Sequence, residues 1–255
     1  MLRFSANLGF LWIDLPLAER IRRAKAAGFD AVEFHFPYDV PAEEVRAALE
    51  QTGLPAVGLN TPRGERPGDM GLAALPGREE EARTAIDRAL AYAQAISAGY
   101  VHVTAGAPGE ERRDAARRAY VDSLAYAAER AAAAGITIVI EPLNRFDAPG
   151  YFLRTSDQAA ALIGALGQDN VRLMFDCYHA QISEGDLTRR IETLLPLVHH
   201  IQIAAVPSRR EPDEGEVAYG RLLNAIDAMG YGGFIGAEYR PRGTVEEGLG
   251  WMRGE

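Results

Sequence analysis

Four short stretches in the second half of the chain share one construction: an apolar, β-branched run that ends in a side chain with an oxygen ligand. They are TIVIE (137–141), RLMFD (172–176), LVHHIQ (197–202) and FIGAE (234–238). Their last residues, Glu141, Asp176, Gln202 and Glu238, are 35, 26 and 36 positions apart, about the length of one strand–helix unit. If these stretches are consecutive parallel strands that end side by side, their oxygen ligands converge at one place.

Apolar runs alternate with segments of helical periodicity along the whole chain. The predicted strands cover 2–8, 30–36, 54–59, 100–103, 136–141, 171–176, 198–203 and 234–238, and the predicted helices cover 15–28, 41–52, 78–98, 110–134, 155–166, 183–194, 217–229 and 245–253. Eight strand–helix units in 255 residues predict an α/β fold, a single (β/α)8 TIM barrel domain over residues 1–255. A doubly wound sheet is the alternative, but a meeting of ligands from four successive strands requires a closed barrel.

The carboxyl ends of the strands form the active-site face of such a barrel, and the four oxygen ligands fall there. A single carboxylate at a strand end can equally be an N-cap or a partner in a loop salt bridge. Three carboxylates packed together without a cation would repel one another and raise their pKa values, a penalty that a divalent metal removes. Ligation by oxygen, with no cysteine or obligatory histidine, indicates a hard ion, Mg²⁺ or Mn²⁺.

The net charge of −9 disfavours nucleic acid as a partner, because phosphate binding requires a basic surface. It is compatible with a small anionic substrate, which needs only one or two local cations. The single cysteine, Cys177, excludes an internal disulfide and a CxxC motif. No apolar run approaches the ~20 residues of a membrane span, and the first residues lack a leader-peptide pattern. The sequence therefore predicts a cytoplasmic protein without membrane contact.

Motifs spread over nearly the whole chain carry a family resemblance. They are FSANLG, VEFHFPYD, LPGREEEA, IEPLNRFDAPGY, FDCYHAQ, HIQIA, EPDEGE, and EYRPRG followed by EEGLGW. In order and spacing they resemble the hydroxypyruvate isomerase family of the xylose-isomerase-like barrels, close to the 2-oxo-tetronate isomerases. The resemblance implies a divalent metal on Glu141, Asp176, Gln202 and Glu238, with Glu141 and Glu238 also acting as the catalytic proton-transfer pair. It implies a ketol isomerase of glyoxylate metabolism that interconverts hydroxypyruvate, a small 2-oxo acid, and tartronate semialdehyde through a cis-enediolate.

Three further residues are predicted to bind the substrate. His179 follows Asp176 by three positions, and related isomerases and epimerases use a histidine in this Asp-x-x-His pattern to contact substrate oxygens; a loop-capping histidine is the alternative. Arg209 and Glu211 lie in SRREP, which resembles the R-x-E-P of the family. The planar guanidinium of Arg209 suits a substrate carboxylate, whereas a solvated loop charge is the alternative.

Other features leave two interpretations open. His35 and His102, on predicted strands, can face a pocket or belong to the core. The polar loop 60–77 is long enough to be a functional lid or a disordered segment. Exposed Trp12 or Trp251 would mark a subunit contact in a homo-oligomer, whereas buried aromatic packing is the ordinary interpretation of each.

The motifs specify the substrate less closely than they specify the class of reaction. The loop sequence QIAAVP replaces the QIADNP usual in hydroxypyruvate isomerases, and with EPDEGE it is closer to 2-oxo-tetronate isomerases, whereas IEPLNRFDAPGY is closer to hydroxypyruvate isomerases. A 2-oxo-tetronate isomerase, or an epimerase of a related small sugar or sugar acid, is therefore the alternative. A metal-dependent nuclease acting at abasic DNA sites would need several histidine ligands and a basic surface, which five histidines and a charge of −9 disfavour. A non-catalytic sugar-acid-binding barrel is a further alternative, which the intact ligand set does not favour.

Overall fold

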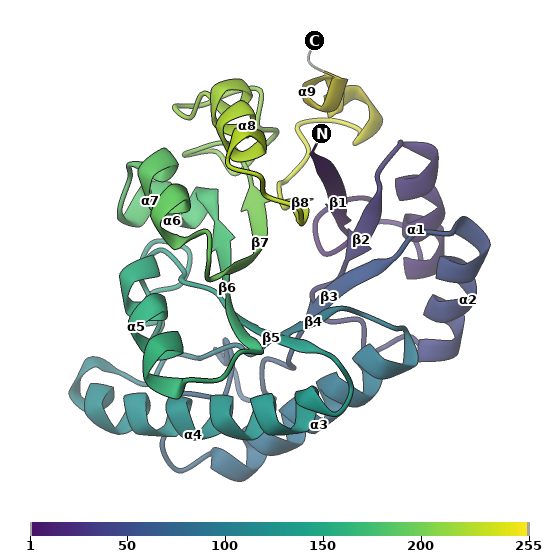
Figure 1. The fold of residues 1–255 in the computed structure, drawn as a ribbon. Coiled ribbons are helices and arrows are strands. Elements are labelled where there is room, and N and C mark those ends of the chain that lie inside the picture. Colours follow the sequence, from purple (N-terminus) through teal and green to yellow (C-terminus); the bar gives the residue numbers. More distant parts are fainter. Residues whose placement is uncertain (1, 254–255) are drawn as a thin grey trace.

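The computed structural model describes residues 2–253, which form a closed barrel of eight parallel strands (Figure 1). The strands are β1 (Arg3–Asn7), β2 (Ala31–Glu33), β3 (Ala56–Asn60), β4 (Tyr100–His102), β5 (Thr137–Ile140), β6 (Val171–Asp176), β7 (Val198–Ile203) and β8 (Phe234–Ala237). β8 pairs with β1 and closes the sheet. The predicted TIM barrel is confirmed; of the domain predicted over 1–255, Met1, Gly254 and Glu255 lie outside the described residues.

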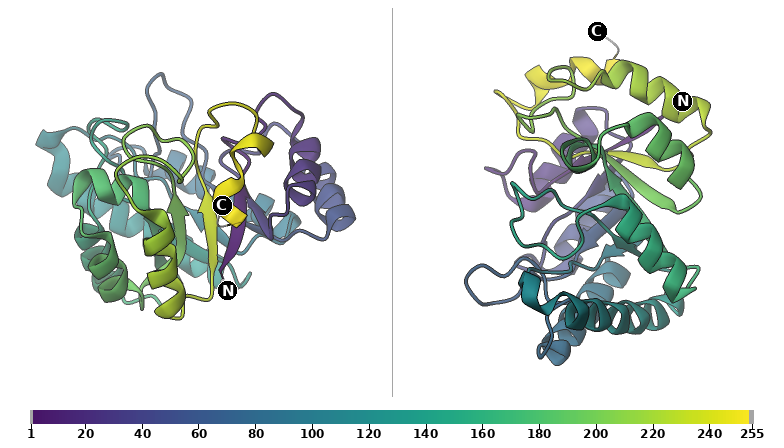
Figure 2. Two further views of the ribbon diagram at one scale, coloured as in Figure 1. Left: turned by 90° about the horizontal axis from the view of Figure 1, so that it is seen from above. Right: turned by 90° about the vertical axis from the view of Figure 1, so that its left-hand side faces the viewer.

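Helices surround the barrel on its outer side (Figures 1 and 2). They are α1 (Leu17–Ala26), α2 (Ala42–Thr52), α3 (Glu79–Ala95), α4 (Arg113–Ala132), α5 (Ser156–Leu166), α6 (Cys177–Ser183), α7 (Leu187–Leu194), α8 (Tyr219–Ala228) and α9 (Gly250–Arg253), with the 3₁₀ turns η1 (Glu110–Arg112) and η2 (Glu246–Gly248). Their apolar faces and the outer faces of the strands form the main core. A smaller apolar cluster of inward-facing residues includes Val57, Tyr100, Val139 and Met174.

The helix α5 shows how local sequence sets the boundaries of these elements. The Thr155 side chain accepts a hydrogen bond from the backbone N–H of Gln158 at 3.2 Å and caps the N-terminus. Gly167 ends the helix with φ = 60°, a left-handed conformation that glycine adopts without a Cβ clash. The Thr155–Ser156 pair is the capping signal from which the start of this helix was predicted.

Two predicted helices differ from those observed. The segment 183–194 is not one helix, because α6 begins at Cys177, directly after β6, and a left-handed turn at Gly185 (φ 71°) and Asp186 (φ 50°) separates it from α7. The C-terminal segment 245–253 is likewise divided into η2 and α9. The first difference matters for the site, since it puts the residues after Asp176 in the first turn of a helix rather than in a loop.

The long loop 60–77 is tied to the barrel at several points. Arg78 donates hydrogen bonds of 2.6 and 2.9 Å to the two carboxylate oxygens of Asp69. Gly71 forms an isolated bridge with Ala105, and Leu72 is buried. These contacts hold the segment against the strand ends of β3 and β4, so that its start forms part of the rim of the barrel.

Both tryptophans take part in intramolecular packing. Trp12 is buried, and its indole N–H donates to Glu246 Oε1 at 2.9 Å. Trp251 on α9 packs edge-to-face against Phe4 of β1, with ring centroids 5.1 Å apart. Among residues 2–253, none of the helices has the length and apolar character that a bilayer span requires.

Candidate active site

The predicted ligands lie together at the carboxyl ends of β5 to β8. Glu141 directly follows β5, Asp176 ends β6, and Glu238 directly follows β8. Gln202 lies in β7, opposite Asp176 in the register of the two strands. All four side chains are buried. The fold therefore brings the oxygen atoms that the sequence singled out to one end of the barrel.

Three of these residues carry an oxygen atom without a hydrogen-bond partner. Within residues 2–253, no donor reaches the buried atoms Glu141 Oε1, Asp176 Oδ2 and Gln202 Oε1. An unpartnered buried polar atom costs about 1–3 kcal/mol, and more when it is charged. A hard divalent cation takes carboxylate and amide oxygens as ligands, so this set of atoms fits such an ion.

His179 lies beside the carboxylates, in the first turn of α6. Its Nε2 is 3.6 Å from Asp176 Oδ2 and 3.9 Å from Glu141 Oε1, and one ligand atom from each of the three residues lies within 4.8 Å of the other two. The backbone N–H of Asn144 donates to His179 Nδ1 at 3.1 Å. In the neutral ring this leaves the hydrogen on Nε2, so His179 presents an N–H donor to the site. Burial, with Arg209 nearby, lowers its pKa well below the ordinary value, which keeps the ring neutral.

Glu238 has partners that the other carboxylates lack. Its Oε1 lies 3.0 Å from His35 Nε2 and accepts a hydrogen bond from Arg209 Nη2 at 3.1 Å. The same guanidinium lies 3.9 Å from Asp176 Oδ2 and 3.6 Å from Asp147 Oδ2. Glu238 is therefore held in place by two nitrogen-bearing side chains at the edge of the cluster.

Arg209 is a buried member of the site and not a solvated loop charge. Its side chain is 13 % exposed, and the rings of Phe10 and Tyr178 lie 4.9 and 4.8 Å from its guanidinium carbon. Its backbone has φ = 54°, in the loop that follows β7. Although burial opposes it, the charges of Glu238 and the neighbouring acids raise the pKa of Arg209. Its positive charge partly balances the carboxylates.

The positive charge of Arg209 does not fully compensate the negative charges of the carboxylates. Burial and the charges of Glu238 and Asp176 raise the pKa of Glu141 well above its ordinary value. Burial and the charge of Glu238 raise the pKa of Asp176 to about 7, even though Arg209 acts in the opposite direction. Without further positive charge, the cluster therefore holds protons near neutral pH.

A fourth buried acid, Glu33 at the end of β2, was not foreseen from the sequence. Its Oε1 accepts hydrogen bonds from Asn7 at 3.0 Å and from Gln202 Nε2 at 3.2 Å. Its Oε2 accepts from the Tyr100 hydroxyl at 3.0 Å and lies 2.5 Å from His200 Nε2. Burial would raise the pKa of Glu33, but the charge of His200 and these hydrogen bonds hold it below the ordinary value.

Glu33 also fixes the orientation of Gln202. Because the carboxylate can only accept a hydrogen bond, it takes the Gln202 amide nitrogen, and the amide oxygen is left as the unpartnered atom. The charged residue within the apolar run DAVEFHF (30–36) was the available signal for Glu33.

A cavity of about 320 Å³ opens at this end of the barrel. Glu141, His179, Arg209 and Glu238 line it, together with His35, His102, Phe10, Phe36, Asn60, Arg63, Asp147 and Arg240. Both histidines that the sequence left open thus face the cavity. Asp147, from the loop after β5, and the aromatic residues were not among the predicted site residues.

Glu211, predicted to bind the substrate, is not among the residues that line this cavity. Its carboxylate is 1 % exposed and accepts hydrogen bonds from the backbone N–H of Arg242, while Arg242 Nε lies 3.0 Å from Oε2. It joins the loop after β7 to the loop after β8. Its contacts are those of a residue that shapes the rim, because its side chain faces the neighbouring loop.

Comparisons with known proteins show the family to which this barrel belongs. A family model described as xylose isomerase-like TIM barrel matches residues 21–255. The 2-oxo-tetronate isomerase of Cupriavidus necator is 46 % identical over 255 residues, which cover 99 % of this chain and 98 % of the relative. The hydroxypyruvate isomerase of Escherichia coli is 38 % identical over 254 residues, covering 99 % and 98 % of the two chains. The crystal structure of an AP endonuclease, family 2, from Brucella melitensis superposes with a TM-score of 0.97 at 42 % identity, covering 100 % of this chain and 99 % of that one.

Proposed function

Because the chain belongs to the xylose isomerase-like TIM barrel family, we propose that it is a metal-assisted ketol isomerase that interconverts hydroxypyruvate and tartronate semialdehyde. The observation that carries this proposal is the group of unpartnered buried oxygens on Glu141, Asp176 and Gln202 at the carboxyl ends of β5 to β7, of which Glu141 lines the cavity. The names of its relatives, hydroxypyruvate isomerase and 2-oxo-tetronate isomerase, support the reaction class.

Glu141, Asp176, Gln202 and Glu238 would hold the divalent ion, Mg²⁺ or Mn²⁺. When bound, such an ion supplies Lewis-acid stabilisation of the negative charge that develops on the substrate oxygens. His179 is left out of this ligand set because its free ring nitrogen carries a hydrogen and its other nitrogen accepts from Asn144. The His179 N–H instead donates to an oxygen of the substrate.

Two glutamates carry out the proton transfer. Glu238, held by His35 and Arg209, removes a proton from C3 of hydroxypyruvate and leaves an enediolate. Glu141, whose Oε1 lacks such donors, delivers a proton to C2, the hydroxyl proton moves from O3 to O2, and proton transfer from Glu238 to Glu141 restores both side chains for the next turnover. Carboxyl groups in environments that differ in this way are suited to opposite roles as base and acid. General acid–base catalysis of this kind contributes roughly 10²–10⁴-fold.

A four-carbon 2-oxo-tetronate is the second candidate substrate. Relatives named 2-oxo-tetronate isomerase are 46 % and 43 % identical to this chain, compared with 38 % for the hydroxypyruvate isomerase of E. coli. An epimerase of a related small sugar acid would use the same two glutamates. The sequence-based predictions of a cytoplasmic location, a role in glyoxylate metabolism and a homo-oligomer stay predictions.

A coupled assay with hydroxypyruvate and 2-oxo-tetronates, before and after treatment with a chelator, tests the proposal. We expect turnover of one substrate, a loss of at least about 100-fold on chelation, since a Lewis-acid metal contributes several kcal/mol, and recovery with Mn²⁺ or Mg²⁺. Activity that is retained after chelation would refute the metal requirement. An absence of turnover with both substrates would refute the proposed isomerase activity.

The AP endonuclease name of a 42 % identical structure makes a nuclease the competing class. The net charge of −9 and the cluster of acids argue against a DNA-binding surface. Incubation with a duplex that carries an abasic site, at low salt where electrostatic binding is strongest, separates the two. Binding and strand cleavage would replace the isomerase proposal.

A further inference from the structure

Arg209, the predicted partner of the substrate carboxylate, already contacts acidic and aromatic side chains of the protein. Its Nη atoms face Glu238, Asp147 and Asp176. The aromatic rings of Phe10 and Tyr178 lie against its guanidinium group. Its Nη2 donates a hydrogen bond to Glu238, its Nη1 lies 3.6 Å from Asp147 Oδ2, and its buried Nε has no hydrogen-bond partner among residues 2–253. A bidentate contact with a substrate carboxylate would therefore compete with the acids that already surround this guanidinium.

Two other arginines line the same cavity and have no acidic partner within the described part of the chain. Arg63 follows β3 in the loop 60–77, and Arg240 follows β8; both are exposed. Neither forms a salt bridge or a side-chain hydrogen bond among residues 2–253. Their guanidinium groups are therefore available to a ligand.

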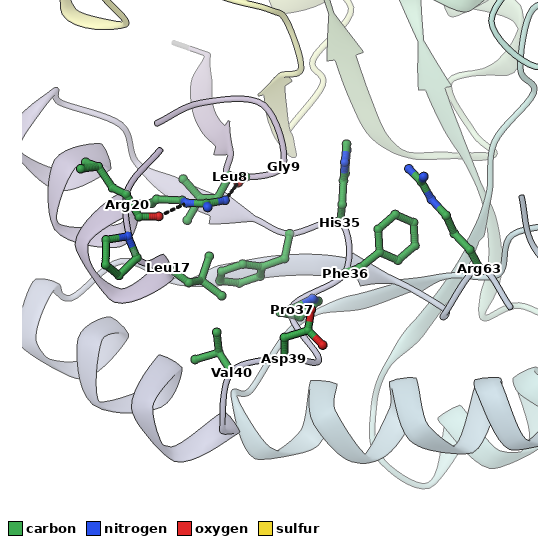
Figure 3. Close-up of a pocket in the computed structure, with 13 residues that line it drawn as sticks. Leu8, Gly9, Leu17, Arg20, His35, Phe36, Pro37, Asp39, Val40 and Arg63 are labelled. Carbon is green, nitrogen blue, oxygen red and sulfur yellow. Dashed lines mark hydrogen bonds between the residues drawn. The ribbon is translucent and has the colours of Figure 1, made fainter. Parts of the chain in front are cut away.

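Aromatic rings hold both arginines at the cavity. The guanidinium carbon of Arg63 lies 4.4 Å from the centre of the Phe36 ring, and that of Arg240 lies 5.9 Å from the Phe10 ring. Figure 3 shows the Arg63 side chain rising beside Phe36 toward the level of the His35 ring, away from Leu17 and Val40. A guanidinium stacked on a ring keeps its edge free for a bidentate contact.

Arg63 also stands where two cavities meet. His35, Phe36 and Arg63 line both the catalytic cavity and a neighbouring one of about 510 Å³, whose other walls include Leu17, Phe34 and Val40. The neighbouring cavity also contains Arg20, but that guanidinium donates to the backbone oxygens of Leu8, Ile13 and Leu15. Arg63 is thus the arginine on this shared wall that can receive an anion.

We propose that Arg63 and Arg240 form the binding site for the carboxylate of the substrate, while Arg209 serves the catalytic carboxylates. This inference rests on the proposed function, and it specifies the substrate class as a short 2-oxo acid whose carboxylate lies at the cavity mouth, away from Glu141 and Asp176. The arrangement keeps like charges apart, because the anionic end of the substrate is placed with the two arginines that no acid neutralises.

Calorimetric binding of tartronate, an anionic three-carbon analogue, to Arg63→Gln and Arg240→Gln tests the proposal. Each variant should bind tartronate about 10-fold more weakly, as expected for loss of a charge-assisted contact. Arg63→Lys should recover part of the affinity because it keeps the charge. Arg145→Gln is the matched control, since Arg145 is exposed, stacks on Phe146 and does not line the cavity.

Kinetics with a matched pair of substrates provides the second measurement. Hydroxypyruvate and dihydroxyacetone differ only in a carboxylate in place of a CH₂OH group. We expect the variants to raise KM for hydroxypyruvate about 10-fold with kcat retained, and to leave the kcat/KM of dihydroxyacetone unchanged. Equal losses with both substrates, or tartronate binding unaffected by both substitutions, would overturn the proposal. If the wild-type protein turns over neither substrate, the isomerase proposal fails, and the tartronate titrations still decide the anion site.

Discussion

Two groups of buried carboxylates lie next to each other inside the barrel, and they differ in their partners. Glu33 is 1 % exposed, while Asp176 and Glu141 are 3 % and 6 % exposed, so burial is nearly the same. Glu33 has neighbouring donors on both of its oxygens, and its pKa is lowered. Glu141 and Asp176 each keep one oxygen without a partner, and their pKa values are raised.

Gln202 joins the two groups, since its amide nitrogen donates to Glu33 while its amide oxygen stays unpartnered. Burial alone therefore does not identify a functional acid. A buried charge with a full set of partners stabilises the fold, whereas a buried charge without them is costly and persists where a ligand or a proton compensates. Glu33 is accordingly a structural acid, and Glu141 and Asp176 belong to the reaction.

Replacing Glu238, the proposed base, should give the largest effect. Glu238→Gln removes the proposed base while it keeps the size of the side chain and an oxygen acceptor. We expect kcat to fall by about 10²–10⁴-fold, the usual contribution of general acid–base catalysis, with far-UV circular dichroism and the unfolding midpoint close to wild type. Full isomerase activity in this variant would refute the catalytic assignment.

Glu33→Gln tests the structural group, and its main effect should be on stability. The substitution leaves the donors of Asn7, Tyr100 and Gln202 without a charged acceptor and removes the ionic contact with His200, and breaking a buried ionic contact costs about 3–5 kcal/mol. Urea denaturation should show this loss. Tyr100→Phe, which removes one hydrogen bond to the same carboxylate, should cost only about 1 kcal/mol. A Glu33→Gln protein as stable as wild type would remove the distinction between the two groups.

The sequence predicted the reactive group better than the structural one, for a physical reason. Glu141, Asp176, Gln202 and Glu238 end apolar runs at regular spacing, and strand periodicity together with the barrel rule places such residues at one face. Glu33 depends on neighbours that are 26 to 169 positions distant in the chain. No local sequence pattern predicts contacts between residues so far apart in the chain.

Arginine and loop roles were harder still to predict. The sequence places Arg209 and Glu211 in one motif, yet one side chain enters the cavity and the other faces Arg242. The positive φ of Arg209 and the hydrogen bonds between this loop and the segment after β8 decide this, and both depend on the tertiary structure. The start of α6 at Cys177 was missed because Asp176 acts as its N-cap, accepting from Tyr178 N–H at 2.7 Å, in addition to its place among the site oxygens.

Asp176→Asn should give a pH-dependent gain in stability of the metal-free protein. The folded pKa of Asp176 is raised to about 7 from an ordinary value of 3.8, so its contribution to stability is fully present below pH 3.8 and is lost as pH rises through 7. Asparagine cannot ionise and avoids that loss. At about one pKa unit per 1.4 kcal/mol, the gain approaches an upper limit of about 4 kcal/mol near pH 8 and vanishes near pH 4.

Urea titrations of chelator-treated proteins at pH 5 and pH 8 measure this difference. Asp122→Asn, on the exposed side of α4, controls for the general effect of removing one negative charge and should show little dependence on pH. Added Mn²⁺ should stabilise wild type more than Asp176→Asn, because the amide is a weaker ligand than the carboxylate. If Asp176→Asn instead loses stability at pH 8, Asp176 resembles Glu33, and its charge is compensated within the protein without a cation.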